Sequence, residues 1–218
     1  MYNNRPLTGS TFFLRFLGGI IGGVSGTIIM LMIYFLSFAA LPAQEESAAS
    51  ITKFILIAMV LLSTITTNMV SSQIITISDR DKYQDSRATL INIFVLNLVL
   101  FIFTIPLYIF IDGENLQFIA AFHLLISAQM SALIMEVFAG YQYPLVGAYG
   151  VAFGGITAFS IVSLILASSA GTGSGISTII LFFAMPLVWG LLELFQCLCE
   201  VVFAKIYERY ALSEEPSE

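Results

Sequence analysis

Charged side chains are scarce in this sequence. Asp, Glu, Lys and Arg make up 10% of the 218 residues, whereas about 25% is normal for a soluble domain. Hydrophobic residues make up 58%. With only eight Lys and Arg residues, the chain also lacks the basic patch that nucleic-acid binding needs. The composition therefore indicates a protein surrounded by lipid, with no nucleic acid as a partner.

Cysteine and histidine are equally scarce. Cys197 and Cys199 lie two positions apart in one apolar run, so they point to different helix faces and cannot readily bridge each other. Together with His123, the single histidine, they do not have the spacing of a metal site. We expect no disulfide framework, no metal and no cofactor.

What the sequence does contain is six long apolar runs, each near or above the roughly 20 residues that a transmembrane helix needs. They predict an all-α, polytopic integral membrane protein with six transmembrane helices. We expect a short cytoplasmic N-terminus at 1–10, one transmembrane domain at 11–207 and an acidic cytoplasmic tail at 208–218. The expected spans are 11–41, 51–78, 88–111, 116–139, 145–167 and 176–204.

The basic residues fall on alternate sides of these runs. Lys and Arg are retained in cytoplasmic loops, so the alternation predicts that both termini lie in the cytoplasm and that the protein resides in the cytoplasmic (inner) membrane. Only Lys53 breaks the pattern. The residues that carry it are Arg5 and Arg15, then Arg80, Lys82 and Arg87, and finally Lys205 and Arg209.

Small residues recur at helical spacing in two of the expected spans. Gly18, Gly22 and Gly26 follow one another every four residues in the first span, and Gly150 and Gly154 do so in the fifth. Glycine weakens a helix but allows another helix backbone to approach closely. We therefore predict that these are packing faces, with spans one and five as a close pair or as contacts with another subunit.

The second span has a polar face formed by Thr64, Thr67, Asn68 and Ser71. The amide of Asn68 cannot be satisfied within its own helix, so this face should contact protein or water rather than lipid. It predicts either hydrogen bonds between helices or a hydrated permeation path.

A few ionisable residues lie within the expected spans, where each is costly and needs a partner or a function. Arg15, Glu136 and Glu200 all lie near the cytoplasmic ends of their spans. We predict a structural ion-pair cluster there, in which Arg15 pairs with Glu136 or Glu200. Glu193 lies deeper, which favours either a proton or cation site or a neutral acid bonded to the polar face of the second span. His123 is either a structural residue or a proton relay.

Signals for catalysis are weak. The segment Gly23-Val24-Ser25-Gly26 resembles the G-x-S-G of rhomboid intramembrane proteases, but the chain has no histidine in a late span. Ser25 also lies inside a predicted helix, whose committed backbone N–H groups cannot form an oxyanion hole. Apart from a lipid-modifying activity that uses Glu193, we expect no enzyme.

Two functions fit these patterns. The first is transport or permeation of a small solute or ion, with Glu193, His123 and the polar face of the second span on the path. The alternative is a non-catalytic structural or assembly subunit that packs through its glycine faces against a second copy or a membrane protein partner. The lipid bilayer surrounds the chain in both cases.

The predicted orientation has a direct test. Cysteines introduced next to Lys82 and in the C-terminal tail should react with a membrane-impermeant reagent from the same side, because both segments are expected in the cytoplasm. Labelling of the two positions from opposite sides would overturn the even number of crossings.

Overall fold

A computed structural model of the chain describes residues 7–40, 45–83, 86–111, 115–139, 144–169 and 174–211, and all regular elements in these ranges are helices. Six are long and apolar enough to cross a membrane, which confirms the predicted all-helical class and matches the six expected spans in number. The helices are α1 (Gly9–Ala40), α2 (Glu45–Ser78), α3 (Ser86–Phe110), α4 (Asn115–Ile134), α5 (Pro144–Ser169) and α6 (Ser174–Ala211), with a π-helical turn η1 (Met135–Ala139) directly after α4.

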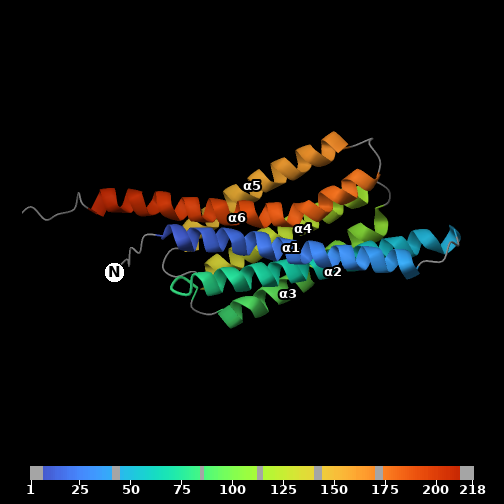
Figure 1. Ribbon diagram of the computed structural model, residues 1–218, viewed down its shortest axis with the longest axis horizontal. Helices are drawn as coiled ribbons and strands as arrows, with labels where there is room; N and C mark the ends of the chain where they lie inside the picture. The colour runs from blue at the N-terminus through green and yellow to red at the C-terminus, as the bar shows by residue number, and fades with distance from the viewer. Residues whose placement is uncertain are drawn as a thin grey trace, which may run out of the picture.

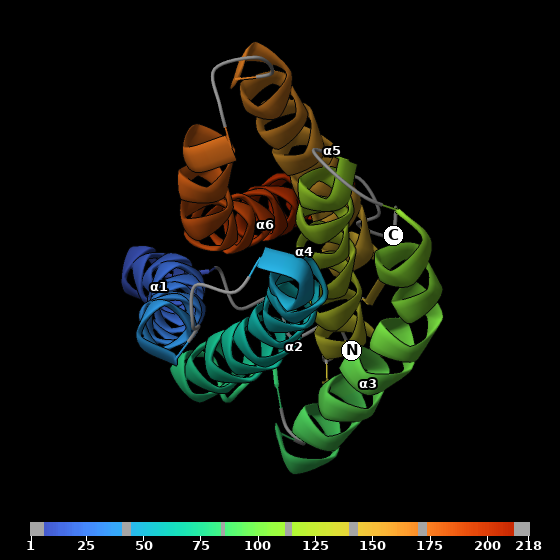
Figure 2. The ribbon, with the colours of Figure 1, turned by 90° about the vertical axis from the view of Figure 1, so that its right-hand side faces the viewer.

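The helices form an elongated bundle (Figure 1). Viewed along its length, α4 lies near the centre and contacts α2, α3, α5 and α6 (Figure 2). In its apolar window 56% of residues are buried, against 17% in that of α3, which lies at the periphery. The helix α1 packs along α2 and α6, and α5 packs along α6. The interior is therefore built around α4 and α6.

The glycines of α1 bring its backbone against two helices at once. A Cβ atom at Gly22 would lie 2.5 Å from the backbone nitrogen of Ser71 in α2. One at Gly23 would lie 2.4 Å from the Cα of Pro186 in α6. Gly18 and Gly26 face α2 through Ile74 and Thr67, as the first span's glycine spacing predicts for a packing face.

The glycines of α5 face α6 rather than α1. Cβ atoms at Gly150 and Gly154 would lie 2.4 Å from the Cα of Gln196 and 2.9 Å from the Cα of Leu192. The expected close pair of spans one and five is therefore wrong. Each glycine-rich helix packs against α6, because α6 lies between them in the bundle and presents backbone to both.

The helix α6 changes direction along its length (Figures 1 and 2). It contains Pro186, whose ring removes a backbone hydrogen bond and bends a helix. The backbone of this proline is where Gly23 of α1 makes its closest approach. The bend and the glycine together set how α1 crosses α6.

Replacing Gly22 by alanine should lower the free energy of unfolding by about 1–3 kcal/mol, because the new methyl group would overlap the α2 backbone. Thermal unfolding in detergent measures the change. The control is Gly190→Ala, whose Cβ would meet only side chains, with Ile20 nearest at 3.3 Å and Phe16 at 3.6 Å. If both variants unfold at the same temperature, the close approach of α1 and α2 is contradicted.

Candidate functional site: a buried ionic cluster

Arg15 is the centre of a cluster at one end of the bundle. Its side chain is fully buried, and its Nε donates to Glu193 Oε2 at 3.2 Å. Its Nη1 donates to both carboxylate oxygens of Glu200, at 3.0 and 3.1 Å, and also lies 3.4 Å from Asp79 Oδ2. Its Nη2 donates to the hydroxyl of Tyr83 at 3.1 Å. One guanidinium thus connects α1 to α6 and to the segment that follows α2.

Lys82 is the second cation. Its ammonium donates to Glu136 Oε1 and Glu200 Oε1, both at 2.6 Å, and to the Tyr83 hydroxyl at 3.0 Å. These three bonds use all three donors of an ammonium group. Tyr83 in turn donates to Glu136 Oε1 at 2.5 Å. The phenol therefore links both cations to the carboxylate of η1.

Tyr83 and Lys82 lie outside the membrane-spanning segments, and the pKa of each is shifted. Burial raises the pKa of the Tyr83 phenol well above its ordinary value, so it stays neutral at pH 7. Burial acts to lower the pKa of Lys82, but the carboxylates of Glu136 and Glu200 outweigh it and the pKa is raised. Lys82 is therefore a permanent cation in the folded protein.

The cluster holds more acids than bases. Four carboxyl groups, those of Asp79, Glu136, Glu193 and Glu200, share the two cations Arg15 and Lys82. Moreover, Glu136 Oε2 and Glu193 Oε1 are buried without a hydrogen-bond partner among the described residues. A cluster that served only to pair charges would leave neither an excess charge nor unsatisfied oxygens, because both are costly when buried.

Glu136 is placed by the π-helical turn. The turn η1 begins one residue before it, where the hydrogen-bonding pattern of α4 widens. Its unpaired oxygen faces α5 at Gly147, where a Cβ would lie 1.8 Å from Oε2. Only a glycine leaves room for this carboxylate. Short π-helical turns occur frequently at functional sites.

The structure brings together some of the ionisable residues that the sequence singled out. Arg15 bonds to Glu200, one of its two expected partners, whereas Glu136 bonds to Lys82 instead. Glu193 is held by Arg15 rather than by the polar face of α2. Sequence reasoning missed Lys82 and Tyr83 as members because a short loop gives no periodic signal for where it folds back.

The polar face of α2 contacts protein throughout. The hydroxyl of Thr64 bonds to the carbonyl of Val60 in its own helix. Those of Thr67 and Ser71 reach Met185 Sδ of α6 and, at 3.3 Å, the carbonyl of Gly19 in α1. In this conformation the α2 face mediates contacts between helices.

Asn68 belongs to a chain of hydrogen bonds that crosses four helices. The indole of Trp189 in α6 donates to Asn68 Oδ1 at 2.9 Å, and Asn68 donates to Asn97 Oδ1 of α3 at 2.8 Å. Asn97 then donates to Ser131 of α4 at 3.2 Å. Amides and an indole do not ionise near neutral pH, so this hydrogen-bonded layer carries no charge.

His123 lies apart from the cluster, beside α3. Its Nδ1 is 2.9 Å from Thr104 Oγ1, and the threonine hydroxyl itself bonds to the carbonyl of Phe101. Thr104 therefore accepts from a protonated Nδ1, which makes Nε2 the unprotonated nitrogen. That Nε2 and the hydroxyl of the neighbouring Tyr108 are both buried without a partner among the described residues.

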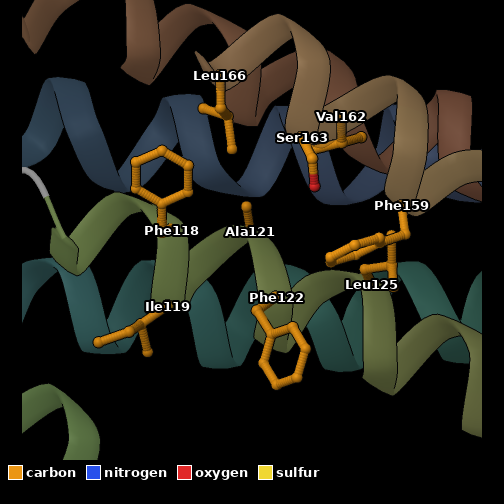
Figure 3. Close-up of a pocket in the computed structure, with 9 residues that line it drawn as sticks. All are labelled: Phe118, Ile119, Ala121, Phe122, Leu125, Phe159, Val162, Ser163 and Leu166. Atoms are coloured by element: carbon orange, nitrogen blue, oxygen red, sulfur yellow. The ribbon is translucent and has the colours of Figure 1, made fainter. Parts of the chain in front are cut away.

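A hollow of about 300 Å³ lies between α4 and α5 (Figure 3), and no charged residue of the described ranges lines it. Its lining is almost wholly apolar, with the hydroxyl of Ser163 as the exception. Such a groove suits hydrocarbon rather than an ion. It is lined by Phe118, Ile119, Ala121, Phe122 and Leu125 of α4 and by Phe159, Val162, Ser163 and Leu166 of α5.

No family model, curated protein sequence or solved structure matches this chain. The site must therefore be interpreted from its own chemistry.

The pairing in the cluster can be tested by charge reversal. Arg15→Glu should destabilise the fold by about 3–5 kcal/mol, because it leaves buried carboxylates without their cation. Adding Glu200→Arg should recover part of this loss, since the two side chains bond directly. Thermal unfolding of each variant measures both effects.

The matched control is Arg15→Glu with Glu136→Arg. Glu136 bonds to Lys82 and not to Arg15, so this pair should recover nothing. Equal recovery by the two pairs, or by neither, would contradict the arrangement.

Proposed function

We propose that this chain is a multi-pass protein of the cytoplasmic membrane that transports a small solute or ion, with its ionic cluster as the site where a proton or cation is exchanged. The excess of carboxylates over cations in this largely buried cluster carries this proposal. The distribution of Lys and Arg supports cytoplasmic termini, and in that orientation the cluster lies at the cytoplasmic end.

The charge count supports exchange rather than a permanent lock. With all six groups ionised, the cluster has two negative charges more than positive ones, in a region largely removed from water. A bound proton or cation lowers the free-energy cost of this excess negative charge, and release of the proton or cation restores that cost. The occupancy of the cluster is therefore coupled to the stability of the contacts between α1, α2, η1 and α6. That coupling is what an ion-driven transporter requires.

The polar residues of α2 fit a closed state of such a transporter. Thr67, Asn68 and Ser71 each bond across to another helix, which leaves no continuous polar route among them. Transport then requires α2 to separate from α1 and α6 at these contacts. The glycines of α1 and the proline bend of α6 lie at the same crossing. They favour such a separation, because small residues and bent helices allow helices to shift.

The assembly-subunit alternative is supported by no feature of the described residues. It relied on glycine faces open to a partner, and these faces are used within the chain. Gly18, Gly22 and Gly26 face α2, while Gly150 and Gly154 face α6.

Flux into proteoliposomes tests the proposal. We expect uptake of labelled sodium, or of protons reported by an internal pH dye, when a gradient is imposed in the presence of a panel of amino acids, sugars and inorganic ions. Glu193→Gln should reduce the flux at least about tenfold, since it removes an ionisable group that should be tightly coupled to transport. The control is Gln129→Leu, which alters a polar side chain of α4 outside the cluster.

Absence of gradient-driven flux in the unaltered protein would refute the transport function. Equal loss of flux in the Glu193 and Gln129 variants would refute the role of Glu193.

A further inference from the structure

Three buried side chains beside the cluster have unsatisfied polar atoms. Glu136 Oε2 and Glu193 Oε1 have no hydrogen-bond partner, and neither do the oxygen and nitrogen of the Gln196 amide, within the part of the chain that the structure describes. All three side chains have 0% exposure. Leaving so many polar atoms unpaired in one region costs several kcal/mol by typical values for single groups, which favours a bound group that satisfies them.

The packing places the three side chains in one region. Glu193 and Gln196 are three residues apart on α6, so their side chains are neighbours on its surface. The backbone of Gln196 packs against Gly150 of α5, and the carboxylate of Glu136 packs against Gly147, one helical turn earlier. The two contacts thus lie within one turn of each other along α5.

The ionic cluster connects the two carboxylates as well. The other oxygen of Glu136, Oε1, accepts from the Tyr83 hydroxyl. That hydroxyl accepts from Arg15, which also donates to Glu193. Two intervening groups therefore separate the carboxylates.

The chemistry of these atoms indicates which ligand would fit. Two carboxylate oxygens and an amide oxygen are hard donors, which bind hard cations. Among the described residues no group of three His, Cys, Asp or Glu side chains could hold a metal ion, so the set of carboxylates that a divalent ion normally requires is not assembled here. A singly charged cation matches the oxygen donors and offsets part of the excess charge.

We propose that Glu136, Glu193 and Gln196 form a binding site for a small monovalent cation such as sodium. The site rests on the proposed transport function and gives it its coupling ion. The carboxylates supply charge, and the Gln196 amide oxygen completes the ligands from the protein.

Trp189, the single tryptophan, reports on this site. It is fully buried, lies one helical turn before Glu193 and is held by Asn68. We expect sodium chloride, but not choline chloride at equal ionic strength, to change its fluorescence saturably in nanodiscs. Sodium should also raise the unfolding temperature of the unaltered protein, because a ligand that binds the folded state stabilises it.

Substitutions test which side chains bind the sodium ion. Gln196→Leu should weaken sodium binding at least about tenfold, as loss of a supporting ligand typically does. The matched control is Gln129→Leu, because Gln129 also packs against an α5 glycine but lies away from the cluster. Glu193→Gln should abolish the response. If Gln196→Leu and Gln129→Leu bind sodium equally, the assignment of Gln196 is wrong.

The outcomes separate the site from the transport function. No sodium effect on fluorescence or unfolding of the unaltered protein, with flux driven by a pH gradient, would overturn the cation site and leave the transport proposal standing. A sodium response that Gln196→Leu weakens, without any flux, would establish the site and refute transport.

Discussion

The contact between the Arg15 guanidinium and the carboxylates of α6 is the interaction on which the rest of this structure depends. A fully buried guanidinium is tolerated only when acceptors surround it, and Arg15 has four, supplied by Asp79, Tyr83, Glu193 and Glu200. Because these acceptors come from α6 and from the loop that follows α2, the position of α1 is tied to the positions of both. The loop is held in turn by Lys82, which extends the cluster to η1.

Glycine makes this contact geometrically possible. Arg15 can reach α2 and α6 together because the next turns of α1 carry Gly18, Gly22 and Gly23, where its backbone lies against both helices. The same device operates on α5, where Gly147 leaves room for the carboxylate of Glu136. Small residues thus decide where charged ones can be buried.

Much of the fold could be predicted from the sequence, since apolar runs separated by charge are a local signal that needs no knowledge of contacts. That Arg15 and Glu200 lie at the same end of the bundle followed from the same pattern. The partners of the glycines did not, because spacing shows that a helix can be approached closely and not which helix approaches it. Lys82 and Tyr83 were missed for a related reason. They lie in a loop, and only the three-dimensional packing shows that the loop folds back over the carboxylates.

The most direct test of the central role of Arg15 is amide hydrogen exchange in the Arg15→Met variant. If one guanidinium ties the cluster together, exchange should accelerate jointly at the cluster ends of α1, α2 and α6 and in η1, while the opposite ends of the helices keep the protection of the unaltered protein. Faster exchange confined to α1 would show that the other segments hold together without Arg15, and would contradict the central claim.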